Sequence, residues 1–188
     1  MSKFCVMKNV ISALFILGCL CVQAQPTSYG NFKVADQEII YQKISIADSI
    51  TPAKLQAFYS ALPYVSNIKM QQDGLAFDVT DIIVDYKKFQ FSQVNLQPIM
   101  QTGKFSGTVV IGVKDGKYRL TLNAIQITGD MGYKKITTRD NLTNYACKNS
   151  GTVLSTDWCK PNMLGLLDQS FSDKLLYVEK NQKDKGDW

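Results

Sequence analysis

Two strand-like segments joined by an Asp-Gly dipeptide constrain the fold more than any other feature of this sequence. Residues 104–128 read KFSGTVVIGVKDGKYRLTLNAIQIT, and Asp115-Gly116 separates two runs in which apolar and polar residues alternate. This dipeptide favours the positive φ angles of a two-residue type I′ turn, so the turn fixes the pairing register. The predicted pairs, which all place apolar side chains on one face, are Val113 with Tyr118, Ile111 with Leu120, Val109 with Leu122, and Gly107 with Ala124. We therefore predict an antiparallel sheet with one buried face.

A second dipeptide of the same kind, Asp73-Gly74, predicts another hairpin. With this dipeptide as the turn, the predicted pairs are Met70 with Phe77, Ile68 with Val79, and Lys69 with Asp78. The apolar alternation slips at residues 81–83 and again at 124–127. Slips of this kind predict bulges or strand ends at which the sheet bends.

Two helices and a first strand complete the predicted elements. Residues 37–46 alternate as a strand, and Thr51 followed by Pro52 has the pattern of a helix N-cap and first helical position. Pro63 ends this helix. Residues 163–180 carry apolar side chains near helical spacing and predict an amphipathic closing helix. The fold class is therefore α+β, with a curved antiparallel sheet and two helices on one face.

The N-terminus has the pattern of a secretory signal peptide covering residues 1–24. Lys3 and Lys8 precede a short apolar run that ends at a small-residue cleavage site. An alternative is lipidation at Cys19, because the residues before it resemble a lipobox. Either route predicts an exported protein, which is periplasmic, extracellular or associated with the outer membrane, with no integral membrane span.

The remaining chain divides by composition into a lead-in, one domain and a tail. Residues 25–36 are short, polar and predicted to be a flexible lead-in. Residues 37–180 form a single α+β domain, within which residues 129–161 show no sustained period and predict a long loop. Residues 181–188 form a solvated tail.

Composition excludes several classes of chemistry. The 188 residues contain no histidine, which removes the commonest general base, the usual zinc ligand and every Ser-His or Cys-His nucleophile pair. We expect no catalytic residue, no metal site and no cofactor. The formal net charge of +5 falls to +3 without the leader, and Arg119 and Arg139 are the only arginines. Because nucleic-acid readers favour arginine, we expect no nucleic-acid partner.

Cys147 and Cys159 are the only cysteines of the chain after the predicted leader. Their separation lacks the Cys-x-x-Cys spacing of redox and metal motifs. In an oxidising compartment two such cysteines most simply form one structural disulfide across the loop, which would contribute about 3 kcal/mol in the chain-entropy model. We therefore predict a Cys147–Cys159 disulfide.

The DGKYR sequence of residues 115–119, following a strand rich in Val and Gly, resembles the hairpin of a family of exported bacterial proteins of unknown function. That family has a fold like that of the TATA-box-binding protein (TBP-like), in the order strand, helix, hairpin, hairpin, helix. The resemblance covers roughly residues 37–128. It implies a fold and an export route, and it implies no activity or functional residue.

The outward face of the central hairpin holds the candidate binding residues, which are Val110, Arg119, Thr121 and Asn123. Arg119 is predicted to lie opposite Gly112, where the missing side chain leaves room above the sheet for a carboxylate or an aromatic group. The other interpretation of Arg119 is that it pairs with a neighbouring acid or covers a face of the sheet.

The sequence leaves three functions open. The first is a non-enzymatic binding or interaction module of the cell envelope, with a protein, peptide or glycan as partner. The second is a histidine-free hydrolase acting on glycans through two carboxylates among Asp78, Asp81 and Asp85. The third is a structural subunit of an envelope assembly.

Overall fold

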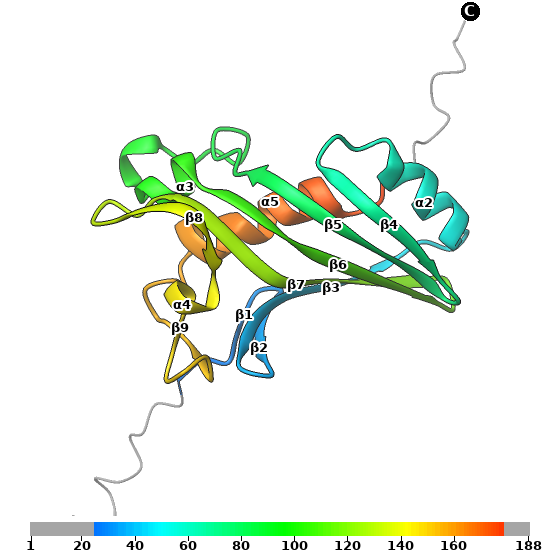
Figure 1. The fold of residues 1–188 in the computed structure, drawn as a ribbon, viewed down its shortest axis with the longest axis horizontal. Helices are drawn as coiled ribbons and strands as arrows, with labels where there is room; N and C mark the ends of the chain where they lie inside the picture. The colour runs from blue at the N-terminus through cyan, green and yellow to red at the C-terminus, as the bar shows by residue number, and fades with distance from the viewer. Residues whose placement is uncertain (1–24, 179–188) are drawn as a thin grey trace, which may run out of the picture.

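A computed structural model describes residues 25–178 and shows an α+β protein built on one antiparallel sheet. The strand order is β1-β2-β3-β7-β6-β5-β4, and β8 pairs with the far half of β7 (Figure 1). The strands of this sheet are β1 (Ser28–Tyr29), β2 (Phe32–Ala35), β3 (Glu38–Ile46), β4 (Val65–Gln71), β5 (Gly74–Ile83), β6 (Lys104–Lys114), β7 (Lys117–Asp130) and β8 (Lys135–Asn141). The other elements are β9 (Cys147–Lys148), β10 (Val153–Leu154), α2 (Pro52–Ser60), α3 (Pro98–Thr102), α4 (Thr143–Ala146), α5 (Leu166–Leu175) and the short helical turns η2 (Gln93–Asn95) and η3 (Pro161–Gly165).

The central hairpin, β6–β7, forms as predicted. Asp115 and Gly116 have φ angles of 48° and 69°, and the predicted pairs closest to the turn are present. The predicted pairing of Gly107 with Ala124 is wrong, because the register shifts there and Ala124 has a φ of 48°. A second shift, in β5, centres on Asp81 with a φ of 55°. Both predicted bulges are therefore confirmed.

The turn of the second hairpin, β4–β5, lies one residue earlier than predicted. Gln72 and Asp73 form it, neither has a positive φ, and Gln71 pairs with Gly74. The predicted Asp73-Gly74 turn and its register are therefore wrong. The reason is packing, since a Cβ on Gly74 would lie 1.8 Å from the carbonyl oxygen of Ile111 in β6. This glycine allows the close approach of two strands instead of turning the chain.

Helix α2 begins as predicted. Thr51 is its N-cap, with its side-chain oxygen accepting a hydrogen bond of 3.3 Å from the backbone N–H of Lys54. The hydroxyl of Tyr59 donates a 2.5 Å hydrogen bond to the carbonyl oxygen of Leu175, the last residue of α5. Helices α2 and α5 therefore meet on the same face of the sheet.

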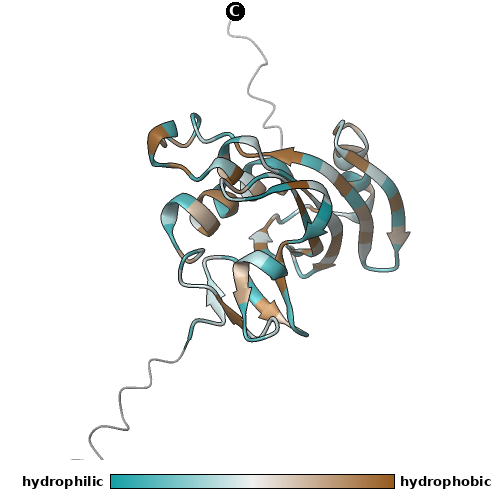
Figure 2. Cartoon of the chain, turned by 60° about the vertical axis from the view of Figure 1, so that its left-hand side comes forward, coloured by the Kyte–Doolittle hydropathy of each residue, from teal (hydrophilic) through white to brown (hydrophobic). Residues whose placement is uncertain are grey.

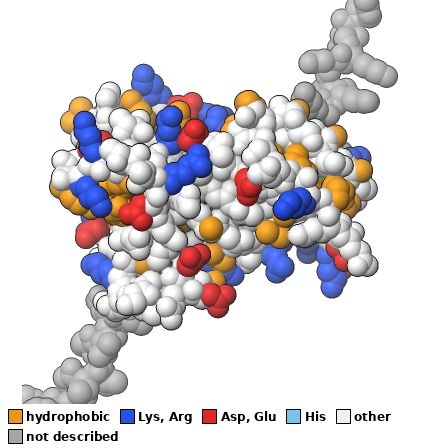
Figure 3. All heavy atoms as spheres, in the orientation of Figure 1, with side chains coloured by type: hydrophobic (Ala, Val, Ile, Leu, Met, Phe, Trp, Pro, Cys, Tyr) orange, Lys and Arg blue, Asp and Glu red, His pale blue; other side chains and the backbone are white. Residues whose placement is uncertain are grey.

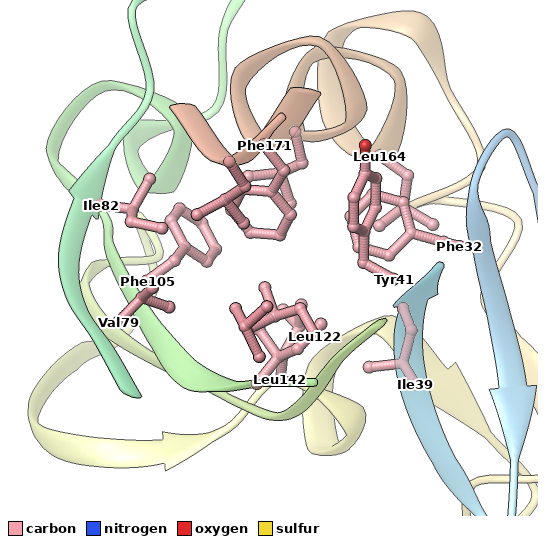
Figure 4. Packing of buried hydrophobic residues seen from close by; sticks show 14 of the residues in the cluster. Phe32, Ile39, Tyr41, Val79, Ile82, Phe105, Leu122, Leu142, Leu164 and Phe171 are labelled. Atoms are coloured by element: carbon pink, nitrogen blue, oxygen red, sulfur yellow. The ribbon is translucent and has the colours of Figure 1, made fainter. Parts of the chain in front are cut away.

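An aromatic cluster holds α5 against the sheet. Phe171 of α5 lies between Phe105 of β6 and Tyr41 of β3, with ring centroids 5.9 Å and 5.4 Å away, and all three side chains are buried (Figure 4). Phe32 of β2 joins the cluster at 5.2 Å from Tyr41. Along the strands, hydrophobic and hydrophilic residues alternate, as a sheet with one buried face requires (Figure 2).

Two segments are more ordered than the sequence predicts. Residues 25–36, the expected flexible lead-in, contain β1 and β2. Strand β1 pairs with β2, and β2 pairs with β3. Residues 129–161, the expected loop, contain the end of β7, β8, α4 and the small β9–β10 sheet. The predicted signal peptide, its Cys19 alternative and the C-terminal tail lie outside the described residues. Within residues 25–178, no helix has the length and apolar character needed to cross a membrane.

Candidate functional site

The four predicted binding residues lie together on the face of the sheet opposite α2 and α5. Val110 pairs with Thr121 and Gly112 pairs with Arg119, in neighbouring rungs of β6–β7. Asn123 follows in the next rung and is partly exposed. Their parity is that of the outward side chains, because the intervening residues of β7 are buried in the core. We call this surface the open face.

The open face contains a bay of about 570 Å³ above Gly112. A Cβ on Gly112 would have no atom within 4 Å, so the space above this glycine is empty. The charged residues that line the bay are Asp73, Lys114, Asp115, Lys117 and Arg119. Among residues 25–178, the three cations make no ion pair and no side-chain hydrogen bond. The interpretation of Arg119 as the partner of a neighbouring acid is therefore not supported.

Apolar and polar side chains surround this bay along β3. Ile44 and Ile46 are 64% and 74% exposed, and Ile44 lines the bay itself. Further along, Lys33 donates to Gln42 at 2.8 Å and Gln42 donates to Thr121 at 3.1 Å. On the face turned to the viewer in Figure 3, cations are interspersed with acids and uncharged side chains, so no continuous basic stripe crosses it.

Asp78, a candidate acid, is held by neutral neighbours. It lies opposite Ser66, and the predicted pairing with Lys69 is wrong because the turn lies one residue earlier than predicted, which places Lys69 opposite Ala76. The side chains of Asn67 and Thr108 donate hydrogen bonds of 2.9 Å and 2.8 Å to its carboxylate. These two hydrogen bonds lower the pKa of Asp78 below its usual value.

The other candidate acids have different partners. Asp81 forms an exposed ion pair with Arg139 at 3.5 Å, and Asp85 accepts a 3.1 Å hydrogen bond from the backbone N–H of Lys88. The three aspartates therefore share none of these hydrogen-bond or ion-pair partners. Within the described part of the chain, no group of three acidic or cysteine side chains is arranged to hold a metal ion.

Cys147 and Cys159 are both free thiols in the structure, so the predicted disulfide is not formed. Backbone hydrogen bonds close this segment instead. Cys147 pairs with Leu154 in the β9–β10 sheet, the N–H of Ser155 donates to the carbonyl oxygen of Ala146 at 2.8 Å, and the N–H of Cys159 donates to Ser155 at 3.1 Å. Burial, with a smaller contribution from Cys159, raises the pKa of Cys147 to about 11.

A polar cluster that the sequence did not predict lies on the opposite side of the sheet, between β1–β3 and α5. Asp168 of α5 accepts hydrogen bonds from the backbone and side-chain amides of Asn31, at 3.1, 2.8 and 3.0 Å. The hydroxyl of Tyr41 donates to Asp168 at 3.3 Å and lies 2.9 Å from the hydroxyl of Ser172. Lys43 donates to Ser172 at 2.8 Å. Burial raises the pKa of Tyr41 far above its ordinary value.

This cluster borders a cleft with a volume of about 780 Å³. Its lining combines residues of the β1–β2 hairpin, β3, η3 and α5 with Phe89. Asn31 and Asp168 are 137 positions apart in the chain, and no motif links them. Only the pairing of β2 with β3 and the packing of α5 bring these groups together, so sequence reasoning missed them.

No protein-family model matches the sequence, and no curated protein matches it. Among solved structures, the chain is similar to a crystal structure of a DUF4468 family protein from Bacteroides ovatus. The two sequences are 13% identical, the alignment covers 77% of this chain and 83% of the other, and the TM-score is 0.41.

Proposed function

We propose that this protein is a non-enzymatic binding module of the bacterial cell envelope, and that its open face binds an acidic segment of a partner protein. One observation carries the proposal: Lys114, Lys117 and Arg119 surround an empty bay without ion-pair partners among residues 25–178. Cations left unpaired beside a hollow attract carboxylates, and a bidentate arginine fixes their orientation.

The neighbouring apolar side chains support a protein partner over a free anion. Ile44 and Ile46 expose most of their surface beside the bay, where a partner's aliphatic or aromatic side chains can cover them. No side chain covers the backbone at Gly112, which lets an extended segment lie close to the sheet. The envelope location rests on the predicted signal peptide of residues 1–24.

A binding role agrees with the chemistry of the chain better than hydrolysis does. There is no histidine. Of the three candidate carboxylates, Asp78 accepts from Asn67 and Thr108, and Asp81 pairs with Arg139. Hydrolysis requires two carboxylates free to face one glycosidic bond, whereas these carboxylates are engaged by other side chains.

Photo-crosslinking in the native envelope tests the proposal. A photoreactive amino acid at Val110, inside the open face, is expected to give one adduct that disappears in Arg119→Glu and weakens with added salt. Lys148→Glu is the matched control, because it makes the same charge change at an exposed residue of β9 and is expected to leave the adduct intact.

Two outcomes would contradict the proposal. An adduct that persists in Arg119→Glu would show that the bay does not provide the contact. An adduct between two copies of this chain would favour the structural-subunit alternative, in which the open face is buried in a homo-oligomer.

A further inference from the structure

The cleft between the β1–β2 hairpin and α5 is preformed by contacts within the protein. Gly30 has a φ of 58°, and a Cβ there would lie 2.6 Å from a carboxylate oxygen of Asp168. The glycine therefore lets the hairpin backbone come close to α5, where Asn31 donates its bonds to Asp168. Because Tyr41 also donates to this carboxylate, Asp168 has little capacity left for a ligand.

Other groups around the cleft keep unused hydrogen-bonding capacity. Neither the Tyr29 hydroxyl nor the Gln169 amide has a side-chain hydrogen bond within residues 25–178. Lys43 donates one hydrogen bond, to Ser172, so two of its three N–H groups are available. Asp173 forms an ion pair with Lys88 through one carboxylate oxygen, which leaves the other.

The mixture of these groups selects the class of ligand. Tyr29 and Phe89 provide two aromatic surfaces in the lining of the cleft. The free polar groups include donors and acceptors, with one lysine and one aspartate, so neither a strongly anionic nor a strongly cationic ligand is matched. A pyranose ring combines an apolar C–H face, which packs on aromatic side chains, with hydroxyls that both donate and accept.

We propose that this cleft binds a neutral saccharide of one to a few pyranose rings. Tyr29 and Phe89 contact the ring faces, while Lys43 and Gln169 hydrogen-bond to the hydroxyls. A volume of about 780 Å³ is in the range of small-molecule sites. Because the cleft is on the helix side of the sheet, this site is separate from the open face, and either proposal can fail without the other.

Titration of the isotope-labelled chain from residue 25 onward with cellobiose, maltose, lactose and diacetylchitobiose tests the proposal by NMR. At least one disaccharide is expected to bind with a Kd of about 1 mM or tighter and to shift the backbone amides of Gly30, Asn31 and Gln169. Gln169→Ala changes an exposed residue of α5, so its fold is expected to persist, and its affinity is expected to fall about tenfold. Tyr29→Leu tests the aromatic contact in the same way.

Gln126→Ala is the matched control, because it removes the same amide from an exposed position on β7 away from the cleft. The proposal is overturned if none of the four disaccharides shifts these amides at about 10 mM. It is also overturned if Gln169→Ala and Tyr29→Leu bind as tightly as the unchanged protein, or if the shifts gather around Arg119 on the open face.

Discussion

Replacement of Asp168 by alanine probes the contact that connects the two ends of the chain. The substitution removes the acceptor of the Asn31 backbone N–H, of the Asn31 side-chain amide and of one Tyr41 hydrogen bond. Tyr41 is completely buried and keeps its contact with Ser172, whereas Asn31 is partly exposed and can bind water instead. The hydrogen bonds that are lost are therefore mainly those that hold the β1–β2 hairpin against α5.

The magnitude follows from the hydrogen bonds that are lost. A hydrogen bond to a charged group contributes about 1.5–3 kcal/mol when it is sheltered, and water compensates part of the loss at Asn31. We expect the free energy of unfolding to fall by about 2–4 kcal/mol. With a urea m-value of about 2 kcal/mol/M, the midpoint of unfolding falls by about 1–2 M.

Urea unfolding followed by circular dichroism measures this change. Asp157→Ala is the matched control: its ion pair with Lys160 is exposed, with 72% of the aspartate side chain accessible, and is expected to change the free energy by less than about 0.5 kcal/mol. Tyr41→Phe is expected to cost about 1 kcal/mol alone and less in the Asp168→Ala background. A loss at Asp168 no larger than that of the control would refute the reasoning.

Three further predictions follow from strand packing and burial. Gly74→Ala is expected to lower the free energy of unfolding by about 1–3 kcal/mol, because its Cβ would lie 1.8 Å from the Ile111 carbonyl oxygen. Gly112→Ala is expected to raise the free energy of unfolding by about 0.5–1 kcal/mol, because a Cβ there meets no atom within 4 Å. Equal effects of the two substitutions in urea unfolding would contradict this account. At about pH 8, iodoacetamide is expected to alkylate Cys147 about a hundredfold more slowly in the folded protein than in urea, because its pKa is raised from 9.0 to about 11; equal rates would argue against its burial. Burial raises the pKa of Tyr59, so its contribution to stability is complete below the ordinary tyrosine pKa of about 10 and is lost as pH rises above it. The part of the tyrosinate absorbance that Tyr59→Phe removes should therefore appear together with unfolding, and its appearance in the folded protein would contradict the prediction.

Local chemistry made the central hairpin predictable. Asp115 and Gly116 adopt the positive φ angles that their turn requires, so the register between the turn and the bulge at Ala124 followed from the two residues alone. The same dipeptide misled at Gly74, where the glycine serves a contact with a strand that comes later in the chain. A turn signal and a packing requirement look identical in the sequence when both call for glycine.

Long-range pairing explains most of what could not be predicted. Phe32 belongs to a short polar segment, and its burial depends on Tyr41 and on Phe171 near the other end of the chain. The open face was predictable because strand alternation fixes which side chains point outward. The cleft was not, since Asn31 and Asp168 share no pattern that a reader of the sequence could detect.

The position of β7 between two different partners also has a consequence for the order of folding. The first half of β7 pairs with β3, its second half pairs with β8, and the bulge at Ala124 separates the halves. As the chain is synthesised, β3 has only the short β2 beside it until β4, β5 and β6 have been made and β7 appears. Its edge, with Ile44 and Ile46, is thus open to wrong pairing throughout that interval. The β6–β7 hairpin, whose contacts are local, forms rapidly, and its arrival closes that vulnerable edge.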